Sequence, residues 1–423
     1  PHPGRAQPRR GQGGRQEPVM KRPELLSPAG DMERLRFALT YGADAVYLAG
    51  KRFGMRAAPD NFTLDELEQA AALCKKAGAR MYVTVNTLPR DRELDALPEY
   101  LQHLNHIRAD GLIVADLGVL SLARRHAPHC EIHMSTQTSI VNAEAAKMYH
   151  ELGASRAVLA RELSLEEIRE MRARIPRELE LEVFVHGSMC MAYSGRCMLS
   201  AYLAGRDANR GACAQPCRWQ YRVVEEYRPG EYLPVEEDAQ GTYIFNSKDM
   251  NLLPRLKEII DAGVDSLKIE GRAKTAYYAA VVTNAYRRAI DLYCAGNGDY
   301  DPPRELLDEP MKVSHREYFT GFYFGDPRTQ HMEDSQYVRE WDVCAVVEEC
   351  DSVGNARLRH KNKFAAEDVL ELLIPGQPAR EITLADMKNA EGEPLALANV
   401  PHMTVYARLP AFAPPLSILR RKK

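Results

Sequence analysis

The sequence predicts an α/β protein: a closed (β/α)8, TIM-like barrel with a cysteine-rich loop after its seventh strand, followed by a small β domain. Eight short apolar runs recur between residues 24 and 271, and helical stretches lie between them. The runs are continuously apolar, which is typical of parallel strands covered on both faces. They lie at Glu24–Gly30, Tyr41–Gly50, Ala77–Asn86, Arg108–Asp116, Glu131–Gln137, Leu152–Arg161, Leu179–Gly187 and Ala262–Gly271.

The ends of the helical stretches support this reading. Thr63 and Ser164 each precede a Glu by three residues, as in a capping box. Leu67, Ala71 and Cys74 then follow at helical spacing. A doubly wound open sheet is the alternative, but no G-x-G-x-x-G turn follows the first run, so we favour the barrel. Left-handed residues just past helix ends are expected at Gly42, Gly78, Gly153 and Gly263.

Composition divides the chain into four segments. The first is rich in Gly, Pro, Arg and Gln and cannot bury a core, so we expect it to be disordered. The barrel includes the cysteine-rich loop at 187–246 and a last long helix at Thr275–Leu292. Short apolar runs with turns predict the β domain, with Arg420–Lys423 as a solvated tail. The segments are 1–21 (disordered extension), 22–295 (barrel), 296–342 (turn-rich linker) and 343–423 (small β-barrel-like domain).

The overall composition is that of an ordinary globular protein. The chain has 423 residues, 45% of them hydrophobic and 27% charged, and its net charge is −3. Binding to RNA would therefore need a local basic patch. No apolar run approaches the roughly 18 residues that span a bilayer, and no secretory segment is visible, so we expect a cytoplasmic protein without a membrane partner. Five scattered cysteines are expected to be small buried apolar residues: Cys74, Cys130, Cys294, Cys344 and Cys350.

The other four cysteines lie close together in the predicted loop. Their spacing is C-x6-C, a longer gap, and C-x3-C. Only the second pair resembles a zinc knuckle, whereas a 4Fe–4S cluster accepts four thiolates at flexible spacing. A cluster, a zinc ion and no metal at all remain open on spacing alone. The four residues are Cys190, Cys197, Cys213 and Cys217.

Arginines and aromatic residues surround these cysteines, among them Arg218 and Trp219. This mixture suits phosphate contact with base stacking, and it also suits bidentate binding of a small dicarboxylate. A solvated loop with local ion pairs is the plain alternative. A second basic stretch at Arg357–Lys363 is a weak signal, because charge runs are usually solvated faces.

Polar residues occur where the predicted strands end, which is where barrel enzymes place their active residues. We expect about half of them to be functional and the others to be solvated caps or ion pairs. His133, within the fifth run, is expected to be a core or rim histidine. The strand-end residues are Ser27, Tyr47, Asn86, Asp116, Ser135, Gln137, Arg161, Glu162, His186, Lys268, Glu270 and Arg272.

One long motif resembles a known family. The run EVFVHGSMCMAYSGRCMLS is similar to the signature of the collagenase-like (U-type) peptidase family, and PELLSPAG, YGADAVY, NSKDMNLL and SLKIEGR resemble that family too. The resemblance covers nearly all of the chain from Pro23 and is strongest to the branch of bacterial tRNA hydroxylases. No H-E-x-x-H, G-x-S-x-G or P-loop motif supports hydrolysis or nucleotide binding. The matching signature residues are Glu182, Phe184, Gly187, Cys190, Gly195, Cys197 and Ser200.

The resemblance implies a function. It implies prephenate-dependent hydroxylation of the wobble uridine of tRNA to 5-hydroxyuridine, with a 4Fe–4S cluster on the four grouped cysteines. A U-type peptidase, or a sister hydroxylase acting on ribosomal RNA or on the ubiquinone ring, is the alternative. No oligomeric state is predicted.

Chemistry assigns roles to the candidate site residues. Planar guanidinium groups match carboxylates, so Arg161 and Arg272 are expected to bind prephenate. Lys268, Glu270 and His186 are candidates for proton transfer. The further substrate-binding candidates are Gln137, Asn86, Tyr47, Arg218 and Trp219.

Overall fold

The computed structural model describes the greater part of the chain. The described residues are 22–54, 61–189, 199–206, 214, 223–224, 232–233, 236–238, 241–243, 248–325 and 338–423. The predicted disordered extension, residues 1–21, lies outside them.

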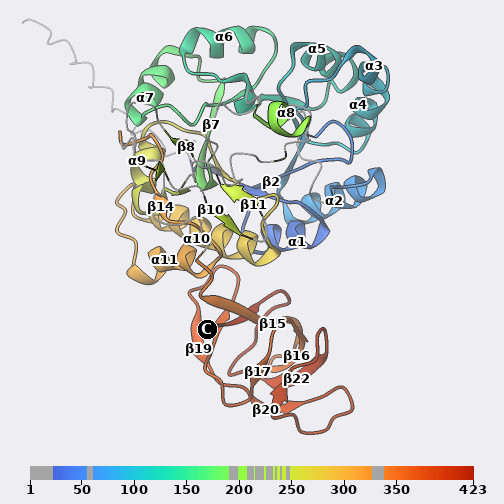
Figure 1. Ribbon diagram of the computed structural model, residues 1–423, viewed down its shortest axis with the longest axis vertical. Coiled ribbons are helices and arrows are strands. Elements are labelled where there is room, and N and C mark those ends of the chain that lie inside the picture. The colour runs from blue at the N-terminus through green and yellow to red at the C-terminus, as the bar shows by residue number, and fades with distance from the viewer. Residues whose placement is uncertain are drawn as a thin grey trace, which may run out of the picture.

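Eight parallel strands close into a barrel (Figure 1). Each strand pairs with the next along the chain, and the last one pairs with both the seventh and the first. The predicted barrel, and the eight runs that form it, are therefore confirmed. The strands are β1 (Glu24–Pro28), β2 (Ala45–Leu48), β3 (Arg80–Val85), β4 (Gly111–Val114), β5 (Glu131–Met134), β6 (Arg156–Val158), β7 (Glu180–Ser188) and β13 (Ser266–Ile269).

Helices surround the barrel (Figure 1). Both predicted capping boxes are present, at Thr63 with Glu66 and at Ser164 with Glu167. The four predicted left-handed glycines have φ angles of 97°, 70°, 103° and 84° in chain order. The helices are α1 (Met32–Thr40), α2 (Leu64–Ala77), α3 (Asp91–Leu94), α4 (Leu97–His106), α5 (Leu117–His126), α6 (Ala143–Glu151), α7 (Leu165–Arg174), α8 (Leu199–Ala204), α9 (Leu256–Asp261), α10 (Ala276–Ala295) and α11 (Arg304–Asp308), with 3-10 turns η1 (Thr136–Thr138), η4 (Leu253–Arg255) and η5 (Glu309–Lys312).

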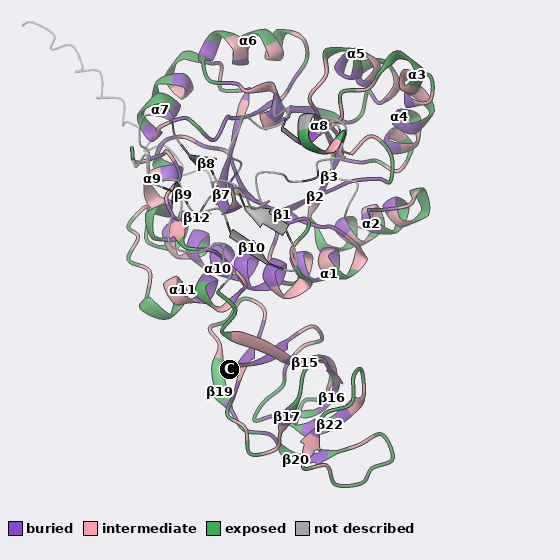
Figure 2. Cartoon of the chain, in the orientation of Figure 1, coloured by how far each residue is buried: buried purple, intermediate pink, exposed green. Residues whose placement is uncertain are grey.

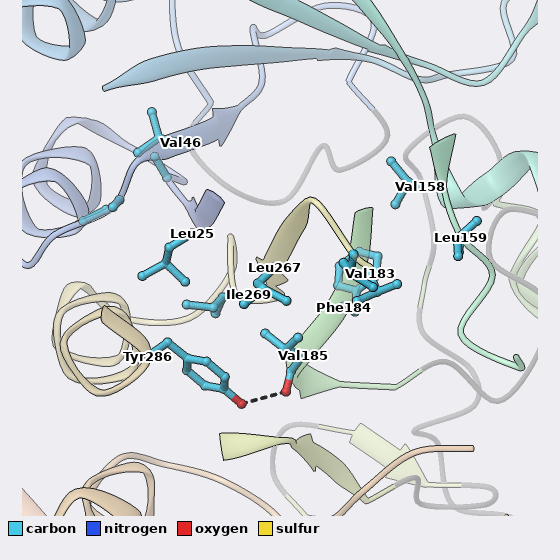
Figure 3. Close-up of a cluster of buried hydrophobic side chains, with 14 of the residues drawn as sticks. Leu25, Val46, Val158, Leu159, Val183, Phe184, Val185, Leu267, Ile269 and Tyr286 are labelled. Atoms are coloured by element: carbon cyan, nitrogen blue, oxygen red, sulfur yellow. Dashed lines mark hydrogen bonds between the residues drawn. The ribbon is translucent and has the colours of Figure 1, made fainter. Parts of the chain in front are cut away.

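The main hydrophobic core lies between the strands and the helices, where buried residues line both layers (Figure 2). Figure 3 shows part of it, with Leu25, Val46 and Val183 among the labelled side chains. Tyr286 of α10 donates a hydrogen bond to the carbonyl oxygen of Val185, 2.8 Å away (Figure 3). This bond fixes α10 against β7, because a buried hydroxyl needs a partner.

Inside the barrel, a charged layer lies at the amino ends of the strands. The Arg156 side chain is fully buried and contacts three carboxylates, Glu24 at 2.7 Å, Glu180 at 2.6 Å and Glu182 at 3.1 Å. Burial alone would raise the pKa of Glu24, but Arg156 and Arg80 lower it to about 2. Barrel interiors are mostly filled by branched apolar residues, so this layer was not predictable from the fold.

Two extra strands extend the sheet beyond the barrel. β12 (Asp249–Asn251) pairs antiparallel with the end of β7, and β14 (Tyr318–Phe319) pairs with β12. The sequence did not predict either strand. The pairing of β12 with β7 places Asp249 beside Ser188. The chain segment from Ser188 to Asp249 therefore begins and ends at the carboxyl end of the barrel. Short described strands within it are β8 (Val223–Val224), β9 (Tyr232–Leu233), β10 (Glu236–Asp238) and β11 (Gly241–Tyr243).

The C-terminal part forms a separate antiparallel sheet with its own core, which confirms the predicted β domain. The predicted solvated tail is wrong for Arg420, whereas Lys422 and Lys423 are exposed as expected. Arg420 lies in the last strand, is fully buried, and contacts Glu309 and Glu371 at 2.7 Å each. Residues Ile418, Leu419 and Arg420 are all buried because β23 lies between β18 and β15 within the sheet, which composition alone does not reveal. The strands are β15 (Trp341–Cys350), β16 (Asn355–His360), β17 (Phe364–Ala365), β18 (Leu370–Leu373), β19 (Arg380–Ile382), β20 (Ala385–Lys388), β21 (Leu397–Ala398), β22 (Thr404–Arg408) and β23 (Ile418–Lys422).

No helix in the described part of the chain is both long enough and apolar enough to cross a membrane.

Candidate active site at the carboxyl end of the barrel

Polar side chains from several strands meet at the carboxyl end of the barrel. We call this group the barrel mouth; its described members are Tyr47, Thr84, Asn86, Ser135, Gln137, Arg161, Glu270 and Arg272. All but Asn86 are buried. Hydrogen bonds between strands that are not neighbours show that these side chains point across the opening.

Tyr47 makes the first of these cross-barrel contacts. Its hydroxyl donates to the carbonyl oxygen of Ile269 at 3.0 Å and lies 3.3 Å from a carboxylate oxygen of Glu270. Since β1 lies between β2 and β13, the contact spans a whole strand. The predicted residues Tyr47 and Glu270 are therefore brought together.

Arg272 makes the second cross-barrel contact. Its guanidinium nitrogen lies 3.4 Å from the Thr84 hydroxyl, and both residues are buried. Arg272 follows β13 while Thr84 lies in β3, and the strands β1 and β2 lie between them around the ring. Sequence reasoning missed Thr84, although its two-residue spacing from Tyr82 within an apolar run places both on the inner face.

A third contact spans the end of β4. The side-chain nitrogen of Asn86, after β3, donates to the Gln137 side-chain oxygen at 2.6 Å. The Ser135 hydroxyl donates to the same oxygen at 3.2 Å. Gln137 is 8% exposed, and its side-chain nitrogen has no hydrogen-bond partner among the described residues. Asn86 and Gln137, both predicted substrate-binding residues, are thus in direct contact.

Arg161 enters the mouth from the end of β6. It is 7% exposed, donates to the Ser188 carbonyl oxygen at 3.0 Å, and lies over the Phe184 ring at 3.8 Å from the ring centre. Its Nε atom has no partner among the described residues. A buried guanidinium without a carboxylate partner is costly unless a ligand supplies the negative charge. The geometry therefore suits an anionic ligand.

Lys268 lies below the mouth, inside the barrel. Its ammonium group is 2.7 Å from Glu182 and 4.6 Å from the centre of the Tyr47 ring. Burial would raise the pKa of Glu182, but Lys268 and Arg156 together lower it. The ion pair joins Lys268 to the charged layer, so a proton transfer by Lys268 would have to break a buried ionic contact.

His186, a predicted catalytic residue, has its contacts outside the mouth. Its two ring nitrogens lie 3.4 Å from the Tyr286 hydroxyl and 3.3 Å from the Tyr318 hydroxyl. The register shift between β7 and β13 places His186 opposite Ile269, which faces the helices. Burial lowers the pKa of His186 to about 3. We therefore assign it a structural setting and no contact with substrate.

Other strand-end residues also have structural contacts. The Ser27 hydroxyl bonds to that of Thr283 in α10 at 2.8 Å. Asp116 caps α5 by accepting from the backbone N–H of Val119 at 3.0 Å. His133 is fully buried against Tyr82, with the ring centres 4.5 Å apart. Asp116 is therefore a helix cap, as expected for part of the set, while Ser27 makes a buried hydrogen bond that was not predicted. His133 is the core histidine that was expected.

The predicted metal ligands lie outside the described residues, as do Arg218 and Trp219. Within the described residues, no three His, Cys, Asp or Glu side chains are arranged to hold a metal ion. Of the five scattered cysteines, Cys294 and Cys350 are only partly buried, so the expectation of burial is wrong for these two. The ligands named above were Cys190, Cys197, Cys213 and Cys217.

Comparison with known families decides the relationship. The model of peptidase family U32 matches residues 30–333, and that of the U32 C-terminal domain matches residues 339–420. The chain belongs to peptidase family U32. This confirms the resemblance inferred from the signature around Glu182 and Gly187.

Relatives of this U32 protein have different names. The tRNA hydroxylation protein P1 of Bacillus subtilis is 37% identical over 409 residues, 96% of this chain and 96% of that protein. A 23S rRNA 5-hydroxycytidine synthase of Escherichia coli is 38% identical over 276 residues, 65% of this chain and 40% of that protein. A protein of Porphyromonas gingivalis named collagenase is 34% identical over 312 residues, 71% of this chain and 73% of that protein.

Proposed function

We propose that this protein hydroxylates the wobble uridine of tRNA to 5-hydroxyuridine, with prephenate as co-substrate and a 4Fe–4S cluster as cofactor. The observation that carries the proposal is the match to a tRNA hydroxylation protein over 96% of both chains. The relative named for ribosomal RNA hydroxycytidine synthesis supports the coarser statement, an RNA hydroxylase. A cytoplasmic location follows from the proposed substrate.

The charges of the barrel mouth support a small acidic co-substrate. Prephenate carries two carboxylates, and a guanidinium holds a carboxylate through parallel hydrogen bonds. Arg161 is buried, and its Nε has no partner within the described residues. Arg272 is also buried and reaches the mouth from the end of β13. We assign the two carboxylates to these arginines, and Glu270, which Tyr47 contacts, to proton transfer.

The pairing of β12 with β7 supports a cluster near the mouth. The segment that contains the four grouped cysteines starts and ends there. A 4Fe–4S cluster held by those thiolates would supply electron transfer. Arg218 and Trp219, in the same segment, suit contact with RNA phosphate and stacking on a base.

The test is a nucleoside analysis of tRNA from a strain without the gene. We expect the 5-hydroxyuridine derivatives to disappear and wild-type protein to restore them. Arg161→Ala should restore less than about a tenth, because a charged hydrogen bond is lost. Arg174→Ala, an exposed arginine, is the control and should restore the full level. An unchanged level in the deletion strain would contradict the proposal.

Ribosomal RNA is the second candidate substrate, favoured by the 23S rRNA relative. The same strain separates the two, because loss of 5-hydroxycytidine from 23S rRNA would select this alternative. For the peptidase alternative, no Ser, Thr or Cys side chain in the described ranges bonds to a histidine ring as an activated nucleophile would. Casein digestion by pure protein, abolished by Arg161→Ala, would revive it.

A further inference from the structure

Two contacts orient the side-chain amide of Gln137. Its oxygen accepts hydrogen bonds from the Asn86 amide at 2.6 Å and from the Ser135 hydroxyl at 3.2 Å. With Asn86 in its present orientation, turning the Gln137 amide over would place its nitrogen 2.6 Å from the Asn86 nitrogen, donor facing donor. The two contacts therefore use the Gln137 Oε1 as an acceptor, and the Nε2 remains available as a donor.

That donor lacks a partner although it is buried. Gln137 is more than nine-tenths buried, and its Nε2 has no partner among the described residues. Nε of Arg161 also has no partner among the described residues. Arg161 follows β6 and Gln137 follows the neighbouring strand β5, so the two residues lie on the same side of the mouth. An unsatisfied buried donor is unfavourable, so both atoms call for an acceptor on a ligand. The ligand at this side of the mouth must therefore present acceptors.

We propose that Gln137 determines which base the protein accepts: its Nε2 donates to the carbonyl oxygen at C4 of a uracil, and the amino group of a cytosine is refused there. This inference rests on the proposed function. Uracil carries an acceptor at C4, where cytosine carries an amino donor. A base held out of its stack can be read along this edge. Cytosine would place donor against donor, which selects against it.

The test measures binding of two RNA hairpins that differ only in U or C at the wobble position of the anticodon loop. Fluorescence anisotropy gives the Kd of each for wild type, Gln137→Glu and Gln102→Glu. Gln137→Glu keeps an acceptor for Asn86 and Ser135 but replaces the donor by a carboxylate oxygen. Gln102→Glu adds the same charge at an exposed position on α4.

We expect wild type and Gln102→Glu to prefer the U hairpin by about tenfold or more. Gln137→Glu should lose that preference or reverse it, because a carboxylate accepts from the cytosine amino group. If this variant does not fold, judged by circular dichroism, Gln137→Met replaces it. Its affinity for the U hairpin should fall about tenfold while that for the C hairpin stays the same.

The outcomes separate the two claims. Wild type that binds neither hairpin better than an unrelated one overturns the proposed function together with this inference. Wild type without base preference, or a preference that survives in Gln137→Glu, overturns the inference and leaves the function standing. Prephenate affinity is measured alongside by calorimetry. A variant that loses prephenate binding but keeps the base preference assigns the donor to the small acid and also overturns the inference.

Discussion

Arg156 is the residue on which the interior of the barrel depends. It is the shared partner of Glu24, Glu180 and Glu182, which belong to β1 and β7. Removing one partner of a buried ionic group leaves the others uncompensated, which costs about 3–5 kcal/mol. The charge of Arg156 therefore stabilises strands that lie far apart in sequence.

For Arg156→Met we expect a loss of about 3–5 kcal/mol in the free energy of unfolding, measured by urea denaturation. Arg174→Met is the control, because its side chain is 67% exposed and pairs with Glu170 within α7. It should lose less than about 1 kcal/mol. Equal losses in the two variants would contradict the role given to the charged layer.

His186 makes stability depend on pH. Its pKa is about 3 in the folded protein, lowered by burial from an ordinary value of 6.5. Between these values the unfolded chain binds more protons, so the stabilisation is complete above pH 6.5 and is lost as pH falls toward 3. His133 and His315 also have lowered pKa values and act in the same direction.

His186→Asn should therefore flatten the dependence of unfolding free energy on pH between 7 and 5. The slope should fall by up to about 1.4 kcal/mol per pH unit relative to wild type. Urea unfolding at several pH values measures it. Glu24 does not interfere, because its ordinary pKa of 4.5 lies below this window. A variant with the wild-type slope would show that the pKa of His186 is not lowered in the folded protein.

At the scale of elements, the junction of β7 and β12 decides where the cysteine segment is attached. Gly187 has a φ of 104°, and a Cβ there would lie 2.4 Å from the carbonyl oxygen of Glu270. Only glycine fits both conditions. The backbone conformation at Gly187 therefore lets the end of β7 leave the barrel and pair with β12.

Cys190→Ala should abolish both the visible absorption of anaerobically purified protein and its RNA hydroxylation, because a cluster ligand is lost. Cys74→Ala removes a thiol that is buried in α2 and should leave iron content and activity nearly unchanged. Iron and sulfide assays measure the first effect. Equal loss in both variants would remove the ligand assignment.

At the scale of the whole molecule, Arg420 joins the C-terminal domain to the barrel part. It contacts Glu371 in its own domain and Glu309 beyond α11. Tyr41 directly follows α1, and its hydroxyl donates hydrogen bonds to the carbonyl oxygens of Leu373 and Leu416, at 3.2 and 3.0 Å. These buried polar contacts hold the two parts in one arrangement, seen in Figure 1.

Arg420→Met should destabilise the protein by about 3–5 kcal/mol and split thermal unfolding into two transitions, one for each part. Scanning calorimetry measures both effects. The control is Lys422→Met in the same strand, whose side chain is 65% exposed and pairs with Glu340. A single, unshifted transition in Arg420→Met would show that the domains are coupled by other contacts.

The amino-acid sequence was sufficient to predict the barrel, because continuous apolar runs, capping boxes and glycines after helices are local signals. It also determined the family through the signature near Glu182, and it named Tyr47, Asn86, Gln137, Arg161, Glu270 and Arg272 as strand-end candidates. Which of these residues come into contact is known from the folded structure. A bulge turned His186 outward, strand closure brought Thr84 to Arg272, and the last strand buried Arg420. Those outcomes depend on register and on partners distant in sequence, which no local pattern encodes.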